Sequence, residues 1–178
     1  MPIPKILHTH MPKWLLIIIA LGVAVVLFFV FRKVYFMAGF GPKIERTLAI
    51  FKPDAISAKN SGKIIDRIEQ EGFNILSMKK INLTQEQAEQ FYEIHKDRVF
   101  FKELVQFMIS GPVVVMVLER DNAIKAWRDL MGSTDPKQAA EGTIRNLYGT
   151  DINKNAVHGS DGEETAKKEV LFFFPELK

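Results

Sequence analysis

The feature that most constrains this chain is an uninterrupted apolar run near its N-terminus. Residues Trp14 to Phe31 form a stretch of 18 residues without a charged side chain. A helix of that length rises about 27 Å at ~1.5 Å per residue, close to the roughly 30 Å hydrocarbon core of a bilayer. Lys13 before the run and Arg32-Lys33 after it can reach the two interfaces. We therefore predict a membrane-spanning helix over residues 14–31, preceded by an N-terminal tail of residues 1–13.

Three other interpretations of this run stay open. A cleaved signal peptide usually has an apolar region of about 7–15 residues and ends in small residues, whereas this run is longer and Phe36 occupies the −3 position of the nearest candidate cleavage site. A buried core helix is rarely apolar on every face. The segment could also fall outside the native product, in which case we expect a soluble cytoplasmic protein.

The residues after the run predict a linker and an orientation. Residues 32–43 include two glycines and a proline, which are typical of a connecting segment. Three basic residues follow the run and two precede it, so the positive-inside bias favours a cytoplasmic C-terminal part. We expect a membrane-anchored protein whose globular domain, residues 44–178, lies in the cytoplasm.

The charge of the chain is divided unevenly between its two parts. Residues 1–43 carry five basic residues and no acidic one, whereas residues 44–178 carry 19 basic and 21 acidic residues, a net charge of −2. A mildly acidic net charge argues against a domain that holds nucleic-acid phosphates on a basic face, so we expect no nucleic-acid partner. The absence of cysteine excludes disulfides, thiolate metal sites and a thiol nucleophile.

The pattern of residues 44–178 predicts an α+β domain. Alternating or continuous apolar residues indicate strands over residues 45–51, 73–83, 113–118 and 170–174. A first helix is predicted around residues 64–68, with Gly72 after its end, and a second begins at the capping box Thr84-Gln87 and runs to about residue 94. A third helix is predicted over residues 100–109, and a fourth from a cap at Asp121 to about residue 131. This order fits a split β-α-β, ferredoxin-like antiparallel sheet with helices on one face.

The run Asn155-Ala156-Val157-His158-Gly159-Ser160-Asp161 is the strongest candidate for chemistry. A neutral histidine ring is a competent nucleophile near physiological pH, and glycine beside it lets the backbone bend. A surface turn that happens to hold a histidine is the plain alternative. Neither a P-loop nor a G-x-G-x-x-G turn follows any predicted strand, and the spacing of metal ligands is absent from the sequence.

Several longer motifs make residues 44–178 closely similar to nucleoside diphosphate kinases. The chain resembles that family at ERTLAIFKPDA (45–55), FYEIH (91–95), FF (100–101), SGPVVVMVLE (110–119), NAIKAWRDLMGSTDP (122–136), GTIRNLYG (142–149) and NAVHGSDG (155–162). The resemblance does not extend to residues 1–43. It implies the ferredoxin-like fold of the family and a kinase that moves the γ-phosphoryl group from a nucleoside triphosphate, chiefly ATP, to a nucleoside diphosphate, balancing NTP and dNTP pools.

The resemblance also implies roles for individual residues. His158 corresponds to the phosphorylated nucleophile of a ping-pong reaction, and Glu169 and Ser160 correspond to the groups that hold its ring. The expected nucleotide-binding residues are Lys52, Tyr92, His95, Phe100, Arg128, Thr134, Arg145 and Asn155. Mg²⁺ is expected on the nucleotide phosphates, without direct protein ligands. The family further implies a homo-oligomer, either a hexamer or a tetramer.

Elementary chemistry agrees with these implied roles. Phosphoryl transfer needs in-line positioning and positive charge around the equatorial oxygens, and arginine matches phosphate oxygens better than lysine does. Stacking on Phe100 contacts only the face of a base, so any base is accepted. A membrane-anchored scaffold that binds nucleotides without turnover is the alternative, although a scaffold has no need of His158 and two arginines together.

Overall fold

The structure is a computed structural model that describes residues 12–37 and 43–177. The chain divides into two units, Met1–Pro42 and Lys43–Lys178, and each is considered by itself. The predicted tail falls mostly on residues 1–11, which lie outside the described residues, as do residues 38–42 of the predicted linker.

The first unit contains a single described helix, α1 (Lys13–Met37). Nearly all of its apolar side chains from Trp14 to Tyr35 are exposed within the unit, as expected for a segment surrounded by lipid. Among the described residues, α1 is the one helix long and apolar enough to cross a membrane. The helix continues past Arg32-Lys33, so the prediction that a linker begins at residue 32 was wrong. Arginine and lysine are good helix formers, and no proline lies between Lys13 and Met37.

The second unit is built on a four-stranded antiparallel sheet. Its strands are β1 (Ile44–Phe51), β2 (Asn74–Ile81), β3 (Val113–Asp121) and β4 (Val157–Gly159), in the order β2-β3-β1-β4. Strand β3 pairs with both β1 and β2, so it separates the two strands of a β-α-β unit. This arrangement confirms the ferredoxin-like prediction.

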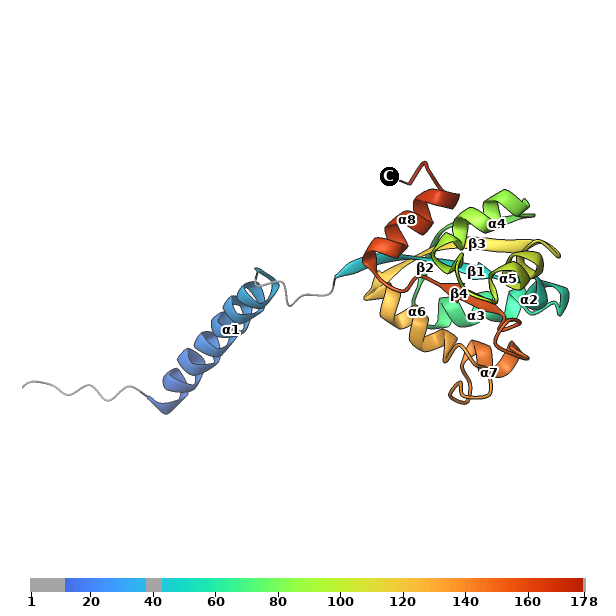
Figure 1. The fold of residues 1–178 in the computed structure, drawn as a ribbon. Helices are drawn as coiled ribbons and strands as arrows, with labels where there is room; N and C mark the ends of the chain where they lie inside the picture. The colour runs from blue at the N-terminus through green and yellow to red at the C-terminus, as the bar shows by residue number, and fades with distance from the viewer. Residues whose placement is uncertain (1–11, 38–42, 178) are drawn as a thin grey trace, which may run out of the picture. The chain divides into compact units, whose positions relative to one another are not determined.

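Helices cover both faces of this sheet, so the expectation of helices on one face was wrong. Alternate residues of β1 enter two separate cores: Ala49 and Phe51 pack with α3 (Ser61–Gln70) and α6 (Ala123–Met131). Leu48 and Ile50 pack on the other face with α4 (Gln85–Phe91), α5 (Phe101–Met108) and α8 (Glu163–Phe173). Figure 1 shows the two helical layers on opposite sides of the sheet. The continuous apolar run of β3 reflects burial on both faces.

Most predicted elements are confirmed, with corrections at three places. Residues 170–174 are not a strand, because they form the last turn of α8 and the residue after it, where Ala166, Val170 and Phe173 are buried at helical spacing. The three-residue strand β4 was missed because so short a stretch has no readable period. Helix α6 is not capped by Asp121, which ends β3, but follows Asn122 in a left-handed conformation.

The local signals at the other helix ends agree with the structure. The capping box between Thr84 and Gln87 is present, and Gly72 takes a positive φ of 76° just after α3. The remaining short helices are α2 (Pro53–Ser57), η1 (Glu93–His95) and α7 (Ile144–Tyr148).

Candidate active site

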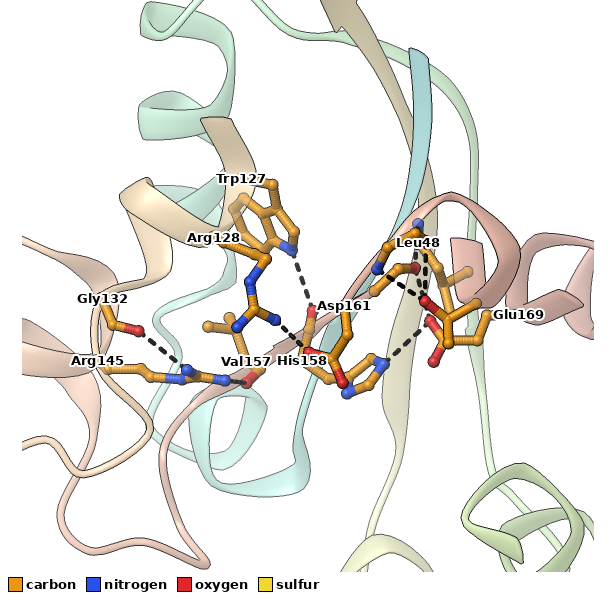
Figure 2. A network of polar contacts seen from close by, with 12 residues as sticks. Leu48, Trp127, Arg128, Gly132, Arg145, Val157, His158, Asp161 and Glu169 are labelled. Atoms are coloured by element: carbon orange, nitrogen blue, oxygen red, sulfur yellow. Dashed lines mark hydrogen bonds and ion pairs between the residues drawn. The ribbon is translucent and has the colours of Figure 1, made fainter. Parts of the chain in front are cut away.

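His158 lies in the middle of β4, paired in register with Ile50 of the buried strand β1. Its side chain is 20% exposed, and its Nε2 lies 3.2 Å from Oε2 of Glu169 on α8. Ser160 donates a 2.6 Å hydrogen bond to the same carboxylate oxygen and accepts one from the backbone N–H of Leu48. Figure 2 shows this connection from the imidazole through Glu169 to β1. These hydrogen bonds connect the imidazole to α8 and, through Ser160, to β1.

The contact with Glu169 distinguishes the two ring nitrogens of His158. A carboxylate accepts a hydrogen bond, so Nε2 carries the proton when the ring is neutral. The Nδ1 atom is then unprotonated, and no described residue donates a hydrogen bond to it. Phe91 and Tyr92 pack edge-on against the ring at centroid distances of 5.3 and 6.1 Å. In this tautomer the lone pair of Nδ1 is free of any donor among the described residues.

Three cationic side chains gather near His158 from separate elements. Lys52 follows β1, Arg128 lies on α6 and Arg145 lies on α7. The guanidinium of Arg145 donates to the carbonyl oxygens of Gly132 and Val157, at 3.0 and 3.1 Å. Arg128 forms an ion pair with Asp161, as Figure 2 shows.

The positive charges of Lys52, Arg128 and Arg145 repel one another. Burial, followed by the charge of Arg128, lowers the pKa of Arg145 to about 10. Burial, followed by the charge of Arg145, lowers the pKa of Lys52 to about 8, although Asp54 and Asp151 act in the opposite direction. Three cations held close together are stabilised when an anion binds among them. The charge arrangement therefore suits a polyphosphate.

Asn155 connects Lys52 to the loop that holds Thr134. Its Oδ1 accepts a 2.6 Å hydrogen bond from Nζ of Lys52, and its amide donates to the carbonyl oxygen of Thr134 at 2.9 Å. The Thr134 side chain is exposed and has no described partner, which leaves its hydroxyl available to a ligand. The next residue, Ala156, is fully buried with φ of 66°, and Val157 N–H donates to the Asn155 carbonyl at 2.7 Å. This hydrogen bond closes a γ-turn of the strained type.

Aromatic side chains line a second side of the site. Tyr92, His95 and Phe100 form a chain of ring contacts, with centroids 6.4 and 5.6 Å apart. Phe100 is 41% exposed, as required for a ring on which a ligand stacks. Burial, followed by the charge of Glu169, raises the pKa of the Tyr92 phenol. Its hydroxyl is buried and lacks a partner among the described residues.

The structure thus brings every predicted site residue into two adjoining groups. The first surrounds His158 and contains Glu169, Ser160, Lys52, Arg128, Thr134, Arg145 and Asn155, and the second contains Tyr92, His95 and Phe100. Tyr92 joins the two groups because its ring touches that of His158.

Sequence reasoning missed several residues that hold this site in place. Asp54 accepts a hydrogen bond from the backbone of Ala156, and Asp161 pairs with Arg128. Both lie inside the quoted motifs, but nothing in the motifs indicates which atoms they bind. The buried Trp127 donates to the His158 carbonyl at 3.1 Å. A Cβ added at Gly159 would collide with the Trp127 ring, so this glycine permits close packing rather than a bend.

A ferredoxin-like sheet that presents a half-buried histidine beside three cations defines a protein suited to phosphate chemistry. The family model described as nucleoside diphosphate kinase matches residues 45–178. Nucleoside diphosphate kinases of Persephonella marina and Myxococcus xanthus are 53% and 58% identical over 135 residues, which is 76% of this chain and 96% and 93% of theirs. The chain therefore belongs to the nucleoside diphosphate kinase family and is an enzyme of that class.

Solved structures agree with this assignment. The Aquifex aeolicus nucleoside diphosphate kinase has a TM-score of 0.73 and 50% identity, covering 74% of this chain and 96% of its own. A halophilic nucleoside diphosphate kinase from Halobacterium salinarum, solved in complex with CDP, has a TM-score of 0.72 and 40% identity, covering 74% and 88%. The family match begins at Glu45, so α1 lies outside it.

Proposed function

We propose that this enzyme transfers the γ-phosphoryl group by a ping-pong relay through His158. The observation that carries the proposal is the contact of Nε2 with Glu169, which holds the proton on that nitrogen and leaves Nδ1 as the nucleophile. In the first half-reaction the Nδ1 lone pair forms a bond to the γ-phosphorus of ATP. The bond from phosphorus to the β–γ bridging oxygen breaks, and ADP leaves with that electron pair. In the second half-reaction the terminal oxygen of another nucleoside diphosphate attacks the phosphorus and His158 leaves.

The surrounding cations stabilise the charge that spreads over the transferred group. Arg128 and Arg145 bind the phosphate oxygens, Thr134 donates its hydroxyl to them, and Lys52 with Asn155 binds the ribose and phosphate side of the nucleotide. The carboxylate of Glu169 stabilises the positive ring that forms when phosphorus bonds to Nδ1. The unpartnered Tyr92 hydroxyl is a further donor beside the ring.

The donor set of the site fits Mg²⁺ that is carried by the nucleotide. Among the described residues, no group of three or more His, Asp or Glu could hold a metal ion, and the phosphate side of the site is cationic. Mg²⁺ bound to the nucleotide phosphates would supply further positive charge beside Arg128 and Arg145. The bases stack on Phe100 beside His95, without base-specific contacts, which suits an enzyme that balances NTP and dNTP pools.

The direct test is the isolation of the phosphorylated enzyme. The full chain in detergent is incubated with Mg²⁺ and γ-labelled ATP without any acceptor. We expect an acid-labile, alkali-stable label that maps to His158 and moves to GDP when GDP is added. The His158→Ala variant should take no label yet still bind ATP, because the binding groups are other residues. An unlabelled wild-type protein that is folded and binds nucleotide would favour the scaffold alternative.

We further propose that α1 anchors the enzyme in a membrane, with residues 44–178 in the cytoplasm where ATP is available. Support comes from the length and the apolar composition of α1. We also propose a homo-oligomer, a hexamer or a tetramer. Strand β2 is an edge strand with exposed apolar side chains at Leu76 and Met78, which suits burial against another copy. The mass of the detergent-solubilised protein tests this.

A further inference from the structure

Asp54 joins the start of α2 to the segment that carries His158. Its Oδ2 accepts a 2.9 Å hydrogen bond from the backbone N–H of Ala156, which lies 102 residues further along the chain. The carbonyl of Ala156 is also bound, because it accepts a 2.9 Å hydrogen bond from the backbone N–H of Lys52. The residues Lys52 to Asp54 therefore hold both polar backbone groups of Ala156.

The residue held in this way has a strained backbone. Ala156 has a φ of 66°, in a region that residues with a Cβ rarely adopt, and it is the centre of the γ-turn closed by Val157 and Asn155. Such a conformation persists only where its surroundings enforce it. In the described structure the enforcing contacts are the carboxylate of Asp54 and the backbone of Lys52.

The turn at Ala156 sets the positions of two site residues, Asn155 and His158. Asn155 precedes it and reaches Lys52 and Thr134 with its amide. His158 follows two residues later in β4. If the turn at Ala156 relaxes, both the amide and the imidazole shift, because they lie on either side of the same short turn.

We propose that Asp54 is a positioning residue for phosphoryl transfer, which acts by holding the Ala156 turn and so aligning Asn155 and His158. This inference rests on the proposed relay through His158. Asp54 does not touch the reacting atoms itself. Its second oxygen, Oδ1, is buried without a described partner. The carboxylate also places negative charge near Lys52.

The test compares Asp54→Ala, Asp54→Asn and the double variant Asp54→Ala/Ala156→Gly in the full chain. The readout is the single-turnover rate of His158 labelling at saturating Mg²⁺ and ATP, with nucleotide affinity measured separately. We expect Asp54→Ala to lower the rate at least tenfold and the affinity less than threefold. Asparagine keeps an acceptor for the Ala156 N–H, so Asp54→Asn should stay within threefold of the wild-type rate.

The double variant distinguishes positioning from simple stabilisation of the fold. Glycine adopts φ near 66° without a clamp, so Ala156→Gly should recover most of the rate lost in Asp54→Ala. Asp66→Ala on α3 is the matched control, because Asp66 is exposed and binds only Gln70 within the described structure. If Asp54→Ala fails to fold, the double variant is judged against Asp54→Asn.

The outcomes separate this inference from the proposed function. A wild-type enzyme without label on His158 would refute the relay itself. A labelled wild type together with an Asp54→Ala rate within twofold of it would overturn the positioning role. A rate lost in Asp54→Ala and not recovered by Ala156→Gly would overturn it as well.

Discussion

At the scale of single residues, the site is marked by polar atoms that the fold buries and leaves unbonded. Among the described residues, five buried side-chain atoms lack a hydrogen-bond partner. Three of them belong to Asp54, Tyr92 and Arg145, all within or beside the site. A buried polar atom without a partner costs about 1–3 kcal/mol, so the fold gives up stability where the nucleotide is proposed to bind.

Lys52 leads to a prediction about pH at the same scale. Its pKa in the folded protein is about 8, lowered mainly by burial and then by the charge of Arg145. Below that pH the ammonium group attracts phosphate, and as the pH rises through about 8 it loses its proton and its charge. We expect kcat/KM, which reports the free enzyme, to fall with an apparent pKa of about 8 on the alkaline side.

The titration of Lys52 does not itself destabilise the fold in this pH range. The unfolded chain keeps the Lys52 proton up to about 10.5, so between pH 8 and that value the unfolded state binds more protons than the folded state. The contribution of Lys52 to the free energy of unfolding therefore rises with pH in that window, while activity falls. A Lys52→Arg variant stays charged and should lose this alkaline limb. The same limb in both proteins would show that another group titrates.

At the scale of elements, the position of His158 depends on how closely α6 packs on β4. Trp127 is fully buried and lies against Gly159, where an added Cβ would also come within 2.7 Å of the Met131 side chain. The indole of Trp127 binds the carbonyl of His158. A larger residue at position 159 must push the helix and the strand apart.

Gly159→Ala should therefore destabilise the domain and slow the reaction together. We expect the free energy of unfolding to fall by about 1–3 kcal/mol, the usual cost of overpacking, and the His158 labelling rate to fall with it. Denaturant unfolding and single-turnover labelling measure the two effects. Gly62→Ala on α3 is the control, since a Cβ there meets no atom within 4 Å. Equal losses in both variants would contradict the packing argument.

At the scale of the whole molecule, the family domain and the apolar helix are separate units. The family match covers residues 45–178, while α1 belongs to Met1–Pro42. The two cores described for the domain contain no residue of α1. Catalysis in the domain should therefore not need the helix.

Deletion of residues 1–40 tests this division. We expect a protein that stays in solution without detergent and transfers phosphate from ATP to GDP at a rate within about threefold of the full chain. The full chain should remain with the membrane fraction after a carbonate wash, because a spanning helix is held by hydrophobic burial rather than by charge. Release of the full chain by carbonate would contradict the anchor, and an insoluble truncated protein would contradict the division.

The sequence by itself determined features that depend on neighbouring residues or on long motifs. The apolar run indicated α1, the capping box indicated the start of α4, and the motifs around Lys52, Arg128 and His158 indicated the family. The order of elements along the chain also indicated a split β-α-β sheet, although it placed a strand at residues 170–174 and missed β4.

Only the tertiary structure decided which atoms meet. The residues 170–174 have a strand-like composition but form the end of α8, because their burial follows a helical spacing that becomes visible only against the sheet. The hydrogen bond from Ala156 to Asp54 joins positions far apart in the chain, so no local pattern encodes it. Likewise, the pKa values of Lys52 and Arg145 depend on burial and on neighbouring charges, which exist only when distant segments are packed together.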